Sequence, residues 1–97
     1  MPTPNRYLVE LAAPAGGWGD LQQVTARARH EAETLSRRGT TVRFLRSIYL
    51  PEDDTCFFLY EGDSVETVGE AGRRAELHVL GIAPALQAQI ASGEGRE

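Results

Sequence analysis

The chain has 97 residues, a formal net charge of −4 and an isoelectric point near 5.1. An acidic chain of this size has no long-range attraction to phosphate backbones or anionic lipid, so nucleic acid and membrane surfaces are poor partners. No apolar run is long enough for a signal peptide or a membrane-spanning helix, and the single cysteine cannot form an internal disulfide. We expect one cytoplasmic domain over residues 1–97, ordered at about 5–91, with a disordered tail at 92–97.

A strand and a helix are predicted first. Apolar residues recur at every second position of residues 6–11, the period of a half-buried strand. Asp20 and Gln23 have the spacing of a capping box, which predicts a helix from there to about Arg38, with Gly39 as its C-terminal cap. The apolar stripe of this helix is Leu21, Val24, Ala28, Ala32 and Leu35.

A hairpin is predicted next. Residues 41–50 and 55–60 are rich in β-branched and aromatic side chains, and the turn-forming residues 51–54 separate them. Strict alternation divides the first of these strands into two faces. One face has Val42, Phe44, Arg46, Ile48 and Leu50, and the other has Arg43, Leu45, Ser47 and Tyr49. Arg46 is out of place among apolar residues, so it either extends past the helices or lies on the other face because the strand bends.

A second helix and a short edge strand complete the pattern. Asp63 and Glu66 form another capping-box pattern, and the helix that follows is expected to end before Gly81. Its apolar face is Val65, Val68, Gly72, Ala75 and Val79. Leu86, Ala88 and Ile90 then alternate with polar residues, as in an edge strand.

The order βαββαβ is that of the α+β ferredoxin-like fold, in which two helices cover one face of a four-stranded antiparallel sheet. The other face is left without a cover. We expect a second copy, or a small molecule, to cover it, and we favour a homodimer. The residues assigned to this open face are Leu8, Leu45, Tyr49 and part of the strand from Cys56 to Tyr60.

Four short motifs occur in one order: YLVE at residues 7–10, FLRS at 44–47, PEDDTCF at 51–57 and EAGRRA at 70–75. Together they resemble a family of small actinobacterial proteins, long described as a domain of unknown function, that includes a nickel-responsive, nickel-binding protein. The resemblance spans about residues 6–83. It implies a ferredoxin-like fold, a dimer and nickel binding.

Three side chains have the soft donor atoms that nickel prefers. His78 lies near the end of the second predicted helix, Cys56 begins the third strand beside acidic residues, and His30 lies on the wet face of the first helix. Each also has an ordinary structural interpretation. The histidines suit solvent-exposed helix positions, and a free cysteine in a strand is usually a small buried hydrophobe.

An enzyme is the alternative. On the predicted open face Glu10 would lie with Arg43, Ser47 and Tyr49, and these groups are sufficient for proton transfer without an organic cofactor, as in a monooxygenase, cyclase or isomerase. The same residues also suit an ion pair across a dimer interface. Trp18 is either a lid over such a cavity or a residue that fixes its loop to the helix. A third possibility is a non-catalytic dimeric interaction module.

Overall fold

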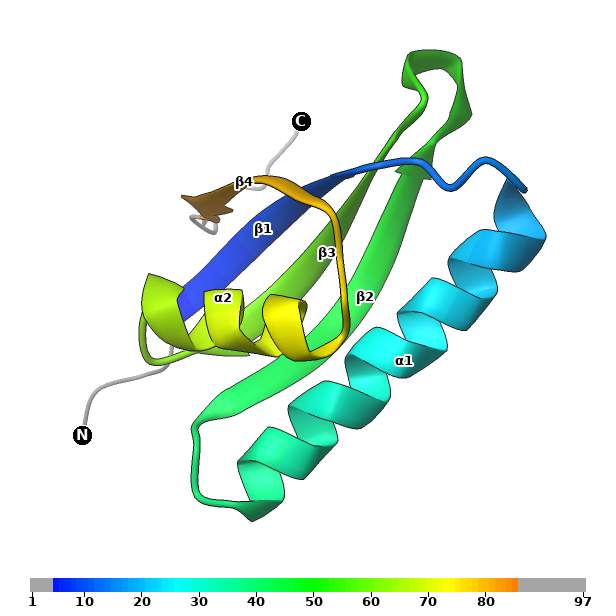
Figure 1. Ribbon diagram of the computed structural model, residues 1–97. Helices are drawn as coiled ribbons and strands as arrows, with labels where there is room; N and C mark the ends of the chain where they lie inside the picture. The colour runs from blue at the N-terminus through cyan, green and yellow to red at the C-terminus, as the bar shows by residue number, and fades with distance from the viewer. Residues whose placement is uncertain (1–4, 86–97) are drawn as a thin grey trace, which may run out of the picture.

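Four strands and two helices follow one another in the order β1-α1-β2-β3-α2-β4, with a 3-10 turn (η1) between β2 and β3 (Figure 1). The computed structural model describes residues 5–85. The bounds are β1 Asn5–Ala12, α1 Trp18–Arg37, β2 Val42–Leu50, η1 Pro51–Asp53, β3 Thr55–Gly62, α2 Val65–Arg74 and β4 Val79–Pro84. The strands form one antiparallel sheet in the order β2-β3-β1-β4, so the predicted ferredoxin-like fold is confirmed.

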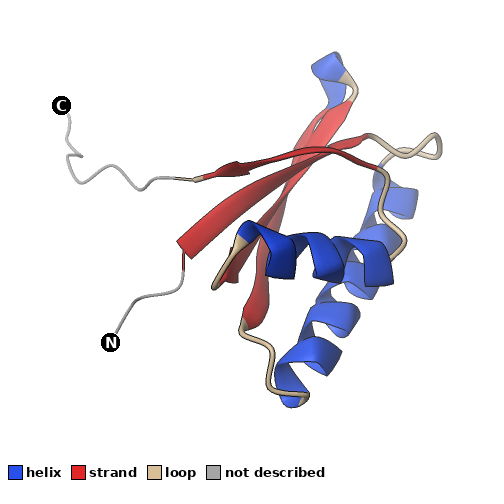
Figure 2. Cartoon of the chain, turned by 60° about the vertical axis from the view of Figure 1, so that its left-hand side comes forward, coloured by secondary structure: helices blue, strands red, loops and turns tan. Residues whose placement is uncertain are grey.

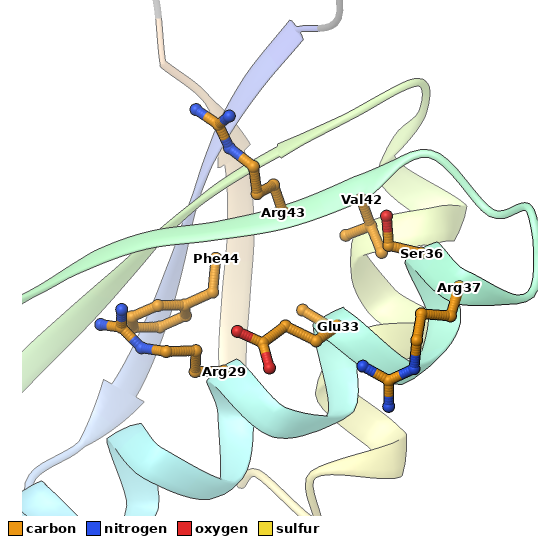
Figure 3. A pocket seen from close by; sticks show the side chains of 8 residues that line it. Arg29, Glu33, Ser36, Arg37, Val42, Arg43 and Phe44 are labelled. Atoms are coloured by element: carbon orange, nitrogen blue, oxygen red, sulfur yellow. The ribbon is translucent and has the colours of Figure 1, made fainter.

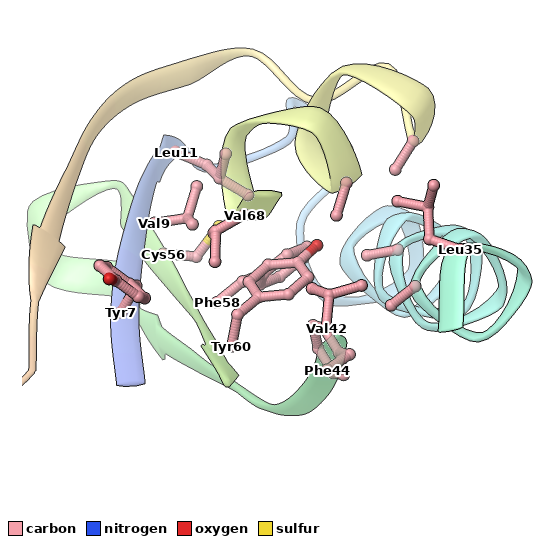
Figure 4. Packing of buried hydrophobic residues seen from close by; sticks show 14 of the residues in the cluster. Tyr7, Val9, Leu11, Leu35, Val42, Phe44, Cys56, Phe58, Tyr60 and Val68 are labelled. Carbon is pink, nitrogen blue, oxygen red and sulfur yellow. The ribbon is translucent and has the colours of Figure 1, made fainter. Parts of the chain in front are cut away.

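Both helices lie on one side of the sheet (Figure 2), and the core fills the space between them. Alternation in β1 and β3 places every second side chain of each strand in that core: Val9 lies opposite Phe58 and Leu11 opposite Cys56, and all four are buried. Helix α1 adds small and branched residues from its apolar stripe, as predicted, and α2 adds Val68 (Figure 4). No helix within residues 5–85 has the length and apolar character needed to cross a bilayer.

Helix α1 begins two residues before the predicted Asp20. Its N-cap is Gly17, whose φ of 73° is in the left-handed region that favours glycine, and no side chain caps it there. The Asp20 carboxylate instead accepts a hydrogen bond from the Gly16 backbone N–H at 3.1 Å. The other end agrees with the sequence pattern, because the helix ends at Arg37 and Gly39 follows with a φ of 98°.

The second helix is shorter than predicted. Its N-cap is Ser64, one residue after the predicted Asp63, and the Ser64 hydroxyl accepts from the backbone N–H of Thr67 at 3.1 Å. Helix α2 ends at Arg74 because Glu76 adopts a left-handed φ of 59°, which turns the chain out of the helix.

The fourth strand also lies earlier in the chain than predicted. Val79 belongs to β4 and not to the helix, although its methyl group still lies beside Gly72 of α2. Strand β4 pairs with β1, and Ile82 lies opposite Val9. The predicted strand at residues 86–90 and the predicted tail at 92–97 lie outside the described residues.

A β-bulge in β2 changes the predicted faces. Phe44 lies opposite Tyr60 while Arg46 lies opposite Leu59, so Leu45 is an extra residue without a direct partner. Because side chains alternate with a period of two, one extra residue moves every later side chain to the other face.

The residues after the bulge therefore exchange faces. Ser47 and Tyr49 pair with the core residues Phe58 and Cys56, so they lie on the helix side, which corrects their assignment to the open face. The open face after the bulge has Arg46, Ile48 and Leu50. Of the two predictions for Arg46, the bent strand is the correct one.

Candidate functional site

A cavity of about 140 Å³ lies where the end of β1, the first half of α1, the start of β3 and the link between α2 and β4 meet. Two of the three predicted soft metal ligands, Cys56 and His78, line it. The sheet register brings Cys56 beside Leu11, and the turn after α2 brings His78 to the same place. The remaining lining residues are Leu11, Ala12, Pro14, Val24, Arg27, Glu76 and Leu77.

Cys56 is fully buried in the sheet, opposite Leu11 on one side and Tyr49 on the other. Burial raises the pKa of its thiol, because a thiolate loses solvation in apolar surroundings. At neutral pH the sulfur therefore keeps its proton, and binding to a cation requires that proton to leave.

The turn that ends α2 positions the other two donor groups. The backbone N–H of Glu76 bonds the Arg73 carbonyl, and the N–H of Leu77 bonds the Gly72 carbonyl, both at 3.0 Å. Leu77 packs against the core, while Glu76 and His78 on either side of it are exposed. The turn thus places a carboxylate and an imidazole at the mouth of the cavity.

Arg27 of α1 closes the cavity from the helix side. Its Nε donates to the Ala75 carbonyl at 2.5 Å, which joins α1 to the last residue of the α2 cap. This bond satisfies a carbonyl that the end of α2 leaves without a helical partner. A cation in the cavity would therefore have one guanidinium as a neighbour, which opposes binding unless Glu76 and an ionised Cys56 offset the charge.

The donor chemistry of this cavity fits a borderline transition metal, since thiol, imidazole and carboxylate are all nickel ligands. Their positions do not form a preorganised site. Within residues 5–85, no three His, Cys, Asp or Glu side chains are grouped closely enough to hold an ion. His30 does not belong to this group, because it lies exposed on α1 and does not line the cavity.

The sequence did not single out Glu76 or Arg27. Glu76 and His78 reach the same cavity because of the turn that ends α2, in which Glu76 adopts a left-handed φ of 59°, and such a turn has no periodic signal in the sequence. For Arg27 the sequence contains no such signal, because its partner carbonyl is distant in the chain.

The predicted enzyme constellation is divided between the two faces of the sheet. Glu10 pairs with Phe57 on the open face, but Ser47 and Tyr49 lie on the helix side because of the bulge. Arg43 is on the open face, where it lies 3.7 Å from the Glu61 carboxylate, and Arg6 lies 3.6 Å from the same carboxylate. The expectation that these four residues share one cavity is therefore wrong.

Trp18 fixes the start of α1 to the sheet. Its indole stacks on the Tyr49 ring with centroids 6.1 Å apart and an interplanar angle of 29°. Because Tyr49 is on the helix side, Trp18 does not cover the open face, and the predicted lid is replaced by the alternative of a residue that anchors its loop.

Comparison with known proteins supports the resemblance seen in the motifs. Residues 7–84 match the SCO4226-like family, described as nickel responsive protein SCO4226-like. The chain belongs to this family. No curated protein matches it in sequence.

One solved structure confirms the fold of this SCO4226-like protein. The crystal structure of SCO4226 from Streptomyces coelicolor A3(2) matches with a TM-score of 0.64 and 24% sequence identity, and the match covers 86% of this chain and 99% of the SCO4226 chain. At this identity the match shows a shared architecture and not a shared set of ligands.

Proposed function

We propose that this SCO4226-like protein binds nickel, and that the cavity lined by Cys56, Glu76 and His78 holds the ion. The main observation behind the proposal is that two predicted soft ligands, distant in sequence, line one cavity together with a carboxylate. The name of the family, nickel responsive, indicates which metal to test first.

Each residue has a separate task in this proposal. His78 is exposed, so its imidazole is accessible and makes the first contact with an incoming ion. Glu76 offsets the positive charge of the ion beside Arg27. Cys56 becomes a ligand only after its thiol loses the proton that burial favours. We therefore expect proton release on binding and an affinity that rises with pH.

The affinity is expected to be modest for a single copy. The three donors must move together before they can share an ion, because no preformed group exists in the described residues. Water or a second copy must supply any remaining ligands. Nickel should therefore bind more weakly than at a rigid site with four protein ligands.

We also propose that the protein is a homodimer that buries the open face of the sheet. This face has several apolar side chains, and two of them, Ile48 and Leu50 of the edge strand β2, are 38% and 40% exposed in one copy. At one end of the face the Glu61 carboxylate lies between Arg6 and Arg43, so the face has charges of both signs, which suits contact with an identical surface. The apolar residues that the register places on this face are Leu8, Ile48, Leu50, Phe57 and Leu59.

Calorimetric titration of metal-stripped, tag-free protein with nickel tests the metal proposal, with zinc and calcium as comparison ions and the native mass measured in parallel. We expect saturable nickel binding that weakens at least tenfold in His78→Ala. His30→Ala is the matched control, because it removes an exposed imidazole that does not line the cavity. Unchanged binding in His78→Ala, or equal loss in His30→Ala, would contradict the proposal.

A further inference from the structure

A second, larger cavity lies on the other side of α1 from the metal candidate. It has a volume of about 450 Å³, which is within the range of small-molecule pockets, and it lies between the second half of α1 and the start of β2. It has no lining residue in common with the Cys56 and His78 cavity. A smaller hollow of about 230 Å³ shares Ser36, Val42 and Arg43 with it and continues the groove past the end of α1.

The floor of this cavity is apolar and rigid. Ala32, Val42 and Phe44 are 1%, 3% and 6% exposed. The Phe44 ring is held by edge contacts to Phe58 and Tyr60, with centroids 5.2 Å and 5.4 Å away. A fixed aromatic and aliphatic floor favours an apolar group of a ligand.

Charged groups of both signs rise from successive turns of α1 above that floor (Figure 3). The Arg29 guanidinium stacks over Phe44 at 5.0 Å from the ring centroid, and Glu33 and Arg37 follow it one turn at a time. Within residues 5–85, none of these three side chains takes part in an ion pair. A guanidinium and a carboxylate without ionic partners thus border one cavity.

The two arginines are not equivalent. Arg37 lies in the last turn of α1, where the helix carbonyls attract cations and repel anions, and it also donates to the Thr34 hydroxyl at 3.3 Å. Arg29 lies within the helix and is stacked on a ring, so the edge of its planar fork of N–H donors is available to a carboxylate. Arg43 does not contribute its charge, because it lies on the other side of β2 (Figure 3) and pairs with Glu61.

We propose that this cavity binds a small amphipathic zwitterion of the α-amino acid type. The ligand carboxylate pairs with Arg29, its ammonium group pairs with Glu33, and its apolar side chain lies on Phe44. Because Arg29 and Glu33 are one helical turn apart on the same face, they can reach two groups attached to one carbon atom. The two opposite charges would also disfavour a simple anion, which Glu33 repels, and a simple cation, which Arg29 repels.

An NMR titration of the protein with three related compounds tests this proposal: L-phenylalanine, 3-phenylpropionate, which lacks the ammonium group, and phenethylamine, which lacks the carboxylate. We expect saturable shifts confined to residues 29–37 and 42–44 with phenylalanine, and at least about tenfold weaker binding of the other two, as the loss of one charged hydrogen bond predicts.

Two variants and a control separate this site from non-specific binding. Arg29→Gln and Glu33→Gln should each weaken phenylalanine binding about tenfold. Arg38→Gln should leave it unchanged, because Arg38 is the exposed cap of α1 and does not line the cavity. Glu33→Gln removes no contact with the core, so it keeps the test valid if Arg29→Gln disturbs Phe44.

The proposal is overturned if phenylalanine gives no saturable shifts in these residues, or if all three compounds bind equally well. It is also overturned if Glu33→Gln leaves the affinity unchanged. None of these results affects the nickel proposal, because the two cavities share no residue.

Discussion

Replacing Tyr60 with phenylalanine should stabilise the protein. Tyr60 is fully buried, and its hydroxyl has no hydrogen-bond partner among the described residues. An unpaired buried hydroxyl costs about 1–3 kcal/mol of desolvation. Removing it leaves an oxygen-sized void, which costs only a few tenths of a kcal/mol at roughly 24 cal/mol per Å³. The ring keeps its edge contact with Phe44 at 5.4 Å.

We therefore expect Tyr60→Phe to raise the free energy of unfolding by about 1 kcal/mol, which for a domain of this size raises Tm by about 5 °C. Urea denaturation with an unchanged m-value measures the difference. Tyr7→Phe is the control, because the Tyr7 hydroxyl is not among the unpaired buried groups, and it should give no stabilisation. A loss of 1 kcal/mol or more in Tyr60→Phe would show that the hydroxyl is satisfied and that the argument is wrong.

Three further outcomes follow from the same structure. Trp18→Ala should lower the free energy of unfolding by about 0.5–1.5 kcal/mol because the stack on Tyr49 is lost. Trp18 is the only tryptophan, so the variant has no tryptophan fluorescence and its unfolding is measured by far-UV circular dichroism. Phe57→Lys should convert the proposed dimer to a monomer in light scattering, whereas Val65→Lys, an exposed site on α2, should not. Stability should fall as pH rises above about 8.5, because the unfolded chain ionises its thiol there while burial keeps Cys56 neutral in the fold, and Cys56→Ala should reduce this fall.

The sequence pattern predicted the fold because periodicity is a local property. Alternation defined β1 and β3, the apolar stripe defined α1, and the turn residues defined the hairpin. The end of α2 was not predicted because it depends on the left-handed conformation of Glu76, and a glutamate in the sequence does not indicate that conformation. Val79 fitted the helical spacing and was therefore assigned to the helix. As a result, the fourth strand was predicted later in the chain than β4, which begins at Val79.

The site was harder to predict because its geometry depends on tertiary contacts. The bulge at Leu45 separates Ser47 and Tyr49 from Glu10, and a single extra residue has no periodic signal. The meeting of Cys56 and His78 likewise requires the sheet register together with the turn after α2. The residue types in the sequence therefore indicated three suitable metal ligands, but not that Cys56 and His78 line the same cavity and His30 does not.

Absorption spectroscopy during nickel addition tests the central proposal most directly, because a thiolate bound to nickel gives a charge-transfer band that imidazole and carboxylate ligands do not. We predict that this band appears in the native protein with release of a proton, grows with pH, and is absent in Cys56→Ser and strongly reduced in His78→Ala. Nickel binding without the band, or with a band that His78→Ala leaves unchanged, would contradict the assignment of nickel to the cavity between Cys56 and His78.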